Sequence, residues 1–525
     1  MEVVKYSILK NTYYDSVTLM NISKEIKSFK GIKEALVGMG TDLNKELAVN
    51  LNLSRPELQE ITPNDFFVSV LADEDTAIED VMKQVDEILN RKNASRSGDY
   101  MPKTLDTAIR YEPDSNLVLI SLPGKYAAQE AKKALNNNLH VMIFSDNVRI
   151  EEEKELKDLA VSKGLLMMGP DCGTAIINNV PLAFANVVRK GHIGIVGASG
   201  TGIQEVTVLI DKLGEGVSQV IGTGGRDLDG EIGGLMMLQG LKALMDDPET
   251  RVIVLISKPP HPSVAEKILK SAEGAGKPIV VDFIGGGMGM AERYKAFAAH
   301  SLEDAARKAA ALLHNEKVED FTGFSLPIEE INKIVEGEAG KFVQDQKYLR
   351  AFYTGGTLAG EAMDILGKDF EIHSNIPLSP ELKLENPMVS YKNTCIDFGD
   401  DAFTLGKPHP MIDPAARIER LLQDAKDDEL ALILMDFVLG YGSHRDPAGE
   451  MLPAIMEAKK SMEERGKYLS IVGYVCGTDK DPQGLRETEN KLKEAGVVLM
   501  PSNAQAAKLA GLILKRQSKG SGFVG

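Results

Sequence analysis

The stretch HIGIVGASGTGIQEVTVLIDKLG, residues 192–214, decides how the chain folds. An apolar run comes first, a turn of glycine and hydroxyl residues follows, and apolar residues then recur at helical spacing. This order predicts a buried strand, a tight turn and a helix. The first backbone N–H groups of a helix have no partner within it, and its dipole favours negative charge there. We therefore expect Ser199, Gly200 and Thr201 to bind a phosphate or a carboxylate.

Two familiar nucleotide-binding motifs are excluded at this turn. Gly197 and Gly202 have the spacing of a P-loop, but Ile203 and Gln204 stand where that motif has Lys and then Ser or Thr. A dinucleotide fingerprint is excluded because the glycine spacing differs and the next strand, ending in VIGTGG, has no acid placed for a ribose hydroxyl. NAD is therefore not expected.

The segment FYTGGTLAGE repeats the same pattern far along the chain. Gly355, Gly356 and Thr357 there open a second predicted helix. A single turn of this kind is more often an ordinary strand-to-helix connection, and with two such turns that alternative remains about equally expected. Because two such turns lie in separate parts of the chain, we expect both helix ends to face one anion.

The composition is that of a large globular protein. With 525 residues the chain should fold into about three or four domains, and its 43% hydrophobic and 26% charged residues exclude global disorder. The net charge of −17 argues against binding to nucleic acid or anionic lipid. No apolar run reaches the ~18 residues of a membrane span, and no signal peptide is recognisable. We expect a cytoplasmic protein that binds neither nucleic acid nor membranes.

The cysteines and histidines show no metal-binding pattern. Cys172, Cys395 and Cys476 lie far apart without CxxC spacing, so neither a disulfide framework nor a zinc site is predicted. The eight histidines include no HExxH motif, and we expect no metal. Cys172 lies in GPDCGT with no histidine nearby in sequence, which favours a buried, inert thiol over a nucleophile.

The alternation of apolar runs and amphipathic segments predicts an α/β protein with several doubly wound parallel sheets. A polar linker, RKNASRSGDYMPK, marks the first boundary, and a charged connector over residues 315–345 marks a later one. The predicted domains are a small α/β domain over 1–90 and three larger units over 104–187, 188–315 and 346–515.

Three other polar segments are candidates for binding. Arg226 lies in the glycine-rich segment GTGGRDLDGEIGG, where a substrate loop and a solvated turn are about equally expected. Lys258 follows an apolar strand at its carboxyl end, where ligands bind in open parallel sheets. Lys407, His409 and Asp413 belong to a proline-rich loop that indicates a rigid binding loop, with a solvated connection as the alternative.

These motifs resemble a known family. Residues 115–315 are similar to the α subunit of succinyl-CoA synthetase, through MGPDCGT, IGIVGASGTG, VIGTGGRDL and GKPIVVDFIGG, and residues 346–515 are similar to the C-terminal ligase domain of its β subunit. Over nearly the whole chain the sequence resembles the FdrA family, through DSVTLM, ITPNDF, YTGGTLAGEA and GKPHPMIDP. The resemblance implies a CoA-binding-type Rossmann domain over 104–187, two flavodoxin-like ligase domains and a small N-terminal α/β domain.

The departures from the synthetases bear on the chemistry. In that family two helix N-termini hold the phosphate of a phosphohistidine, and the resemblance places residues 199–201 and 355–357 at those positions. The loop that carries the catalytic histidine has no counterpart, since His300 falls beyond it, and Lys258 stands where the family has a glutamate. A lysine neutralises a free anion directly. The ATP-grasp portion and the turn that contacts CoA also lack clear counterparts, so CoA is a weaker expectation than phosphate.

The resemblance to FdrA implies one subunit of an oligomeric oxamate carbamoyltransferase of allantoin and purine catabolism. Our leading hypothesis is that the chain helps to interconvert oxalurate plus phosphate and oxamate plus carbamoyl phosphate, with Lys258 offsetting charge. Arg226, Lys407 and Asp413 are expected to contact the oxamate part, and His409 to act as an acid or base. Two alternatives stay open: a component of an NDP-forming acyl-CoA synthetase, and a noncatalytic scaffold with an anion pocket.

Overall fold

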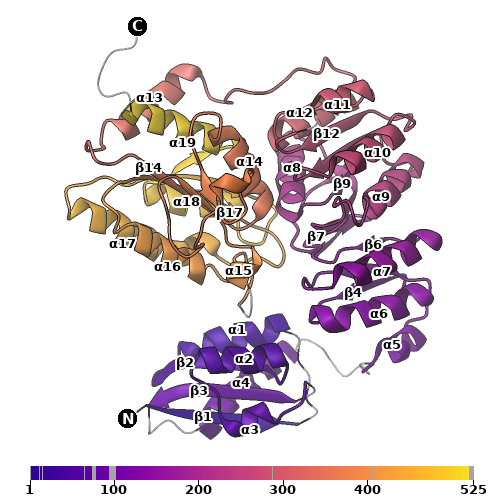
Figure 1. Ribbon diagram of the computed structural model, residues 1–525, viewed down its shortest axis with the longest axis vertical. Coiled ribbons are helices and arrows are strands. Elements are labelled where there is room, and N and C mark those ends of the chain that lie inside the picture. Colours follow the sequence, from indigo (N-terminus) through magenta and orange to yellow (C-terminus); the bar gives the residue numbers. More distant parts are fainter. Residues whose placement is uncertain are drawn as a thin grey trace. The chain divides into compact units, whose positions relative to one another are not determined.

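The structure is a computed structural model that describes residues 2–10, 12, 14, 16–63, 65–73, 78–93, 102–286, 288–404 and 407–518. The chain divides into two compact units (Figure 1). The first unit contains residues 1–115, 121–130 and 405–408, and the second contains residues 116–120, 131–404 and 409–525.

The first unit contains a small α/β domain around a three-stranded antiparallel sheet in the order β1-β3-β2. Alternate residues of β3 point to opposite faces, so that Val68 and Val70 pack in one core while Phe67 packs in another. The small N-terminal domain expected from the sequence is confirmed. Its elements are β1 (Glu2–Leu9), α1 (Ser16–Lys27), β2 (Ile32–Met39), α2 (Asp42–Asn50), α3 (Pro56–Gln59), β3 (Phe66–Asp73) and α4 (Ile78–Asn93), and α5 (Leu105–Tyr111) follows.

The next part of the chain forms a short parallel sheet in the order β4-β5-β6. Its strands follow the alternation of apolar runs and amphipathic segments in the sequence. The elements are β4 (Leu117–Ile120), α6 (Gly124–Asn136), β5 (His140–Ile143), α7 (Ile150–Ser162) and β6 (Met167–Met168).

A seven-stranded sheet, in the order β13-β12-β11-β9-β10-β7-β8, forms what we call the central lobe, residues 174–313. Its strands are parallel except that β7 and β8 add as an antiparallel edge. These two strands precede residue 188, so the sheet includes part of the segment that the sequence pattern assigns to the preceding domain. The elements are β7 (Thr174–Ile177), β8 (Val180–Ala183), β9 (Lys190–Gly197), α8 (Gly200–Lys212), β10 (Val217–Gly222), α9 (Leu235–Asp246), β11 (Val252–Ser257), α10 (Pro262–Ala272), β12 (Ile279–Phe283), α11 (Met288–Arg293), β13 (Phe297–Ala298) and α12 (Leu302–Leu313).

A six-stranded parallel sheet, in the order β15-β16-β14-β17-β18-β19, forms the C-terminal lobe, residues 348–518. The connector before it is partly helical, because α13 (Ile328–Ala339) packs its apolar residues against α19. The elements of the lobe are β14 (Tyr348–Tyr353), α14 (Gly356–Leu366), β15 (His373–Ser374), the 3-10 helix Pro380–Leu382, β16 (Thr394–Asp397), α15 (Asp401–Thr404), α16 (Ala415–Asp424), β17 (Leu430–Val438), α17 (Pro447–Glu463), β18 (Ser470–Cys476), α18 (Leu485–Glu494), β19 (Val498–Met500) and α19 (Asn503–Ser518).

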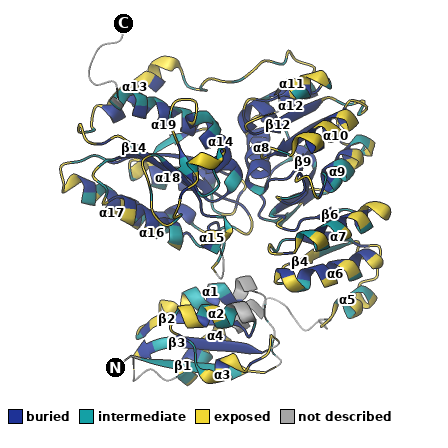
Figure 2. Ribbon diagram, in the orientation of Figure 1, coloured by how far each residue is buried: buried dark blue, intermediate teal, exposed yellow. Residues whose placement is uncertain are grey.

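The two lobes share one hydrophobic core in which α8, α12, α14 and α19 pack together. Ile203 of α8, Leu358 of α14 and Leu509 of α19 are all fully buried there. Figure 2 shows the sheets as mostly buried and the outer helix faces as exposed. This packing brings the N-terminal ends of α8 and α14 together. Within the described parts of the chain, no helix has the length and apolar character needed to cross a membrane.

Candidate functional site

The two glycine turns singled out in the sequence meet in space. The Ser199 side chain caps α8 by accepting a hydrogen bond of 3.0 Å from the N–H of Gly202. The Ser199 Oγ also lies 2.5 Å from the Oγ1 of Thr357, in the first turn of α14, so the two hydroxyl groups share a hydrogen bond. The structure therefore joins the start of one helix directly to the start of the other.

Gly355 makes this close approach possible. It is the N-cap of α14, and its φ of −162° is an extended conformation that any residue adopts. A Cβ atom at this position would lie only 2.4 Å from the Cγ2 atom and 2.7 Å from the Oγ1 atom of Thr201. Space, and not backbone conformation, is what requires glycine here.

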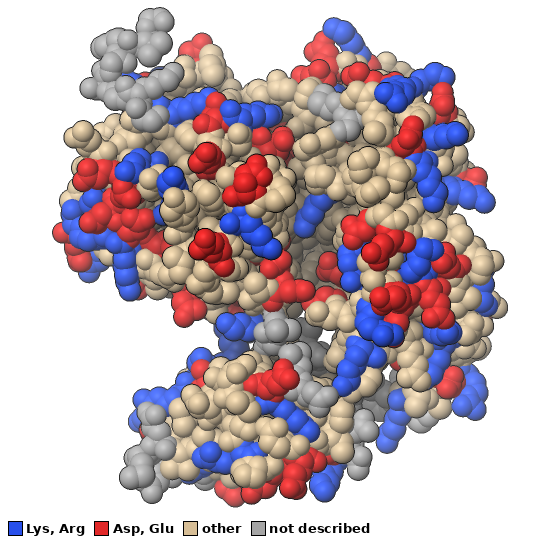
Figure 3. All heavy atoms as spheres, in the orientation of Figure 1, with Lys and Arg blue, Asp and Glu red and all other residues tan. Residues whose placement is uncertain are grey.

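Five backbone N–H groups at this junction have no hydrogen-bond acceptor among the described residues. Two belong to Gly200 and Thr201 of α8, and three belong to Gly356, Thr357 and Leu358 of α14. Both helix dipoles place partial positive charge at the same point, and a bound anion would offset their mutual repulsion. Figure 3 shows acidic and basic side chains mixed over the visible face, so an anion has to be held by such a local device.

A lysine lies beside the second turn. Lys258 directly follows β11, and a Cβ atom on Gly356 would be 2.4 Å from its Nζ atom and 2.6 Å from the Oδ2 atom of Asp397. Lys258 has no ion pair with any residue that the structure describes. Its ammonium group is thus available to a ligand at the start of α14.

Two buried carboxyl groups near Lys258 have raised pKa values. Burial raises the pKa of Asp171 to about 6 and that of Asp397 to about 6, although Lys258 lowers both. Groups with such values exchange protons readily near neutral pH. Neither was identified from the sequence. Asp397 is the last residue of β16, and Asp171, which has a left-handed backbone conformation with φ 54°, comes shortly after β6. Their position at the carboxyl ends of strands is the sequence signal that could have identified them.

His409 lies beside this site but stays uncharged. Its ring packs against Phe184 with ring centroids 5.2 Å apart, and its Nδ1 atom accepts a hydrogen bond of 3.2 Å from the N–H of Met411. Burial lowers the pKa of His409 to about 4, so at neutral pH the ring is neutral and is no strong base. The N–H group of Gly399 donates a hydrogen bond to the carboxylate of Asp397. A Cβ atom on Gly399 would lie 3.1 Å from the Nε2 atom of His409, so His409 is close to Asp397.

Arg226 contacts the start of α7. Its guanidinium group donates to the carbonyl oxygen of Val148 at 2.7 Å and pairs with Glu153 at 2.8 Å. These contacts fasten the glycine-rich loop to the start of α7. Both contacts use the Nη2 atom of Arg226, and the side chain stays 41% exposed, so the expectation that Arg226 holds a substrate carboxylate stays a prediction.

The proline-rich loop divides between the two units. Asp413 accepts a hydrogen bond of 3.1 Å from the N–H of Ala415, the first residue of α16. Lys407 is grouped with the first unit, and residues 405 and 406 lie outside the described residues. The structure thus brings Ser199, Gly200, Thr201, Gly355, Gly356, Thr357 and Lys258 together, with His409 nearby.

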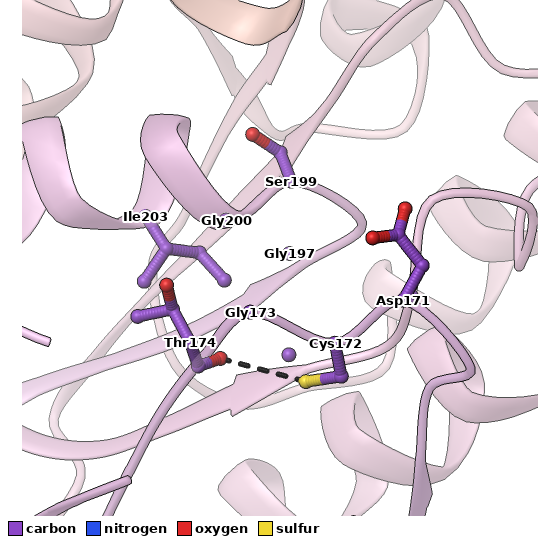
Figure 4. A pocket seen from close by; sticks show the side chains of 10 residues that line it. Asp171, Cys172, Gly173, Thr174, Gly197, Ser199, Gly200 and Ile203 are labelled. Atoms are coloured by element: carbon purple, nitrogen blue, oxygen red, sulfur yellow. Dashed lines mark hydrogen bonds between the residues drawn. The ribbon is translucent and has the colours of Figure 1, made fainter. Parts of the chain in front are cut away.

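The cysteine of GPDCGT is buried beside the first turn. The thiol of Cys172 donates a long hydrogen bond of 3.7 Å to the carbonyl oxygen of Thr174, drawn as a dashed line in Figure 4. Burial raises the pKa of Cys172 to about 12. The thiol therefore stays protonated at neutral pH, as the interpretation of an inert side chain requires.

One cluster has the ligand types of a metal site. His300, Asp304 and Asp320 place a ligand atom each within 4.8 Å of one another. The ammonium group of Lys308 already lies 2.9 Å from Asp304 and 2.6 Å from Asp320, so the charge of both carboxylates is offset. His300 also lies 3.4 Å from Asp320. This lysine occupies the place where a cation would bind.

Comparison with known proteins gives the class of the chain. Residues 352–513 match the family model for a CoA-ligase, and residues 188–285 match the model for a CoA binding domain. Subunit alpha 2 of an ADP-forming succinate–CoA ligase from Archaeoglobus fulgidus is 26% identical over 151 residues, which cover 28% of this chain and 51% of that protein. The chain is thus succinyl-CoA synthetase-like, with the expected α/β fold. It spans about half the length of that relative.

The chain belongs to the family of YahF, an uncharacterized protein of Escherichia coli K12. The two are 45% identical over 509 residues, which cover 97% of this chain and 98% of YahF. Among solved structures, a dinucleotide forming acetyl-coenzyme A synthetase 1 of Ca. Korarchaeum cryptofilum has 17% identity and a TM-score of 0.33, over 78% of this chain and 86% of that one.

Residues 1–104 match the model for the AllF heavy metal-associated domain. This stretch contains neither cysteine nor histidine. Because thiolate and imidazole are the ligands that soft transition metals prefer, these residues do not fit such a metal. The description names the fold of the segment and not a metal site in this chain.

A cavity beside α7 does not fit CoA. An open cavity of 510 Å³ is lined by Asp229, Glu231 and His261 together with Ile150 and prolines. Two carboxylates at this cavity repel a diphosphate group, so its lining does not fit the phosphates of CoA.

A buried carboxyl group behind this junction should make stability depend on pH. Glu205 of α8 is fully buried and accepts a hydrogen bond of 3.1 Å from the N–H of Asn503. Burial, followed by repulsion from Glu361, raises its pKa from 4.5 to about 8. Between these values the unfolded state loses a proton that the folded state keeps, so stability falls as pH rises.

Replacing Glu205 by glutamine should remove this dependence. Between pH 5.5 and 7.5, the free energy of unfolding should fall less steeply with pH for the Glu205→Gln variant than for the parent. The two slopes should differ by up to about 1.4 kcal/mol per pH unit, the value for one proton. Urea unfolding at several pH values measures this slope. The exposed Glu249→Gln is the control and should leave the slope unchanged. Equal slopes for Glu205→Gln and the parent would show that Glu205 ionises normally in the folded protein.

Proposed function

We propose that the chain is an FdrA-type subunit of a cytoplasmic carbamoyltransferase, and that it binds phosphate and carbamoyl phosphate between its central and C-terminal lobes. The observation that carries this proposal is the hydroxyl contact between Ser199 and Thr357 with the unpaired ammonium group of Lys258 beside it. Unpaired N–H groups from two helix ends and one lysine suit a small dianion.

The proposed reaction is phosphorolysis of oxalurate. An oxygen of hydrogen phosphate attacks the carbamoyl carbon of oxalurate, a C–O bond forms, and the C–N bond to the oxamate nitrogen breaks. The proton of the phosphate passes to that nitrogen, so oxamate and carbamoyl phosphate are released with atoms and charge balanced. Lys258 offsets negative charge that develops on oxygen. Asp171 and Asp397, with pKa values of about 6, relay the proton.

A component of an NDP-forming acyl-CoA synthetase is the second candidate. The matches to CoA-ligase and CoA binding domain models favour it. Against it stands the lysine at 258, since a cation beside the helix ends suits a free phosphate better than an imidazole carrier.

The chain, purified with its partner subunits, should cleave oxalurate only when phosphate is present. CoA-dependent release of ADP from ATP, without phosphate-dependent cleavage of oxalurate, would reject carbamoyl transfer.

Removing the hydroxyl groups of Ser199 and Thr201 tests whether the junction is an active site or a regulatory pocket. Removing both hydroxyls in Ser199→Ala/Thr201→Ala deletes the α8 cap and a phosphate contact, and each charge-assisted hydrogen bond is worth about 1.5 to 3 kcal/mol. We expect the KM for phosphate to rise at least tenfold and turnover by the complex to fall. If phosphate affinity falls while assembly and turnover persist, the pocket regulates its partners and the chain is a scaffold.

A further inference from the structure

A small pocket lies beside the start of α8, and the proposed function gives no role to one of its lining residues, Thr174. The volume that the centre of a water molecule can occupy in this pocket is about 10 Å³. That is room for about one water-sized group, such as a single oxygen atom. Figure 4 shows Thr174, Gly200 and Ser199 around it, with Asp171 at another side. The pocket therefore accepts a single oxygen and excludes a whole phosphate.

The hydroxyl group of Thr174 is the unexplained feature of this pocket. Thr174 is the first residue of β7 and is 2% exposed, yet its Oγ1 atom has no hydrogen-bond partner among the residues that the structure describes. A buried hydroxyl without a partner costs about 1 to 3 kcal/mol, so such groups are normally satisfied. The thiol of Cys172 is directed to the carbonyl oxygen of Thr174 and does not serve the hydroxyl.

The hydroxyl group also faces the helix start. A Cβ atom on Gly200 would stand 3.5 Å from the Oγ1 atom of Thr174. The N–H group of Gly200 is one of the unpaired donors in the first turn of α8. A buried hydroxyl and an unpaired amide thus lie on two sides of a space with the size of one oxygen.

We propose that this pocket seats one oxygen of bound phosphate or carbamoyl phosphate, with the Thr174 hydroxyl and the Gly200 N–H group as its donors. The assignment rests on the proposed function. It adds a positioning role for Thr174 of β7, which belongs to neither of the two helix turns. With one oxygen fixed in the pocket, the remaining oxygens lie toward Lys258 and the start of α14. Asp171 also lines the pocket, where its carboxylate can accept a hydrogen bond from a protonated phosphate oxygen.

Titration calorimetry of the full chain with inorganic phosphate tests the seat. Thr174→Val removes the hydroxyl and keeps the shape of the side chain, and we expect phosphate to bind about tenfold more weakly. Thr174→Ser keeps the hydroxyl and is the matched control, with binding within about twofold of the parent. If the valine variant binds phosphate as tightly as the serine variant, the pocket holds only water and the proposal is overturned.

A second variant keeps the test decisive if Thr174→Val does not fold. Gly200→Ala adds a methyl group at ordinary contact distance from the Thr174 hydroxyl, where it fills the pocket without a clash. It should weaken phosphate binding at least tenfold. If the Thr174 and Gly200 variants bind normally while Ser199→Ala/Thr201→Ala does not, the seat is wrong and the proposed function stands. If all of them bind phosphate as the parent does, the proposed function fails.

Discussion

Replacing Gly355 by alanine should weaken phosphate binding about 100-fold, as expected when displacement of α14 removes a hydrogen bond to the charged ligand worth up to about 3 kcal/mol. The new Cβ atom would lie 2.4 Å from the Thr201 side chain, which is 6% exposed and β-branched, so it has little room to turn away. The start of α14 has to move away from α8 instead. We also expect a loss of about 1 to 3 kcal/mol in the free energy of unfolding, as for other overpacked cores.

Gly360, one turn further along α14, provides the control for this substitution. A Cβ atom there would meet nothing closer than Ile284 at 4.0 Å. Gly360→Ala should stabilise the helix by about 0.5 to 1 kcal/mol and leave phosphate binding unchanged. Calorimetry with phosphate and urea unfolding measure both quantities. Equal phosphate affinities for Gly355→Ala and Gly360→Ala would mean that contact between the two helix starts is not needed for binding.

Removing the charge of Lys258 should give the second large effect. In the assembled complex, Lys258→Met should lower kcat/KM for phosphate-dependent cleavage of oxalurate by about 10² to 10³, as when a group that stabilises developing charge is lost. Lys258 also lowers the pKa values of Asp171 and Asp397. Without it both values should rise, so the ionisation near pH 6 in the rate profile should move to higher pH.

The direction of this shift separates Lys258 from a merely structural residue. Lys270→Met, on the exposed side of α10, removes the same charge away from the site and should change neither the rate nor the pH profile. A Lys258→Met variant that keeps full activity and an unshifted profile would exclude Lys258 from the reaction. A reduced rate with an unshifted profile would show that Asp171 and Asp397 do not carry the proton.

The fold was predictable because local pattern and burial agree. In β17, the run LALILMDFV is buried at every position between β14 and β18, as a continuous apolar run in a parallel sheet predicts. The antiparallel edge formed by β7 and β8 was not predictable. Its short strands attach to β10, and strand pairing across a domain boundary leaves no local signal.

The anion site was predictable in part, for a related reason. Glycine turns are local, so the turns at Ser199 and Gly355 could be identified, and the structure brings them together. Ion partners are not local. Arg226 is engaged by Glu153 on another element, and the raised pKa of Asp171 depends on burial by segments far along the chain. Carboxylates at loop ends are common in any sequence, and only the folded chain distinguishes those beside Lys258.

A crystal structure of the full chain with phosphate would test most directly whether the two helix starts and Lys258 hold a free oxyanion. We predict one phosphate in contact with the N–H groups of Gly200 and Gly356 and with the ammonium group of Lys258. Phosphate found on a histidine side chain, or helix starts that remain in contact with no anion bound beside them, would contradict the account.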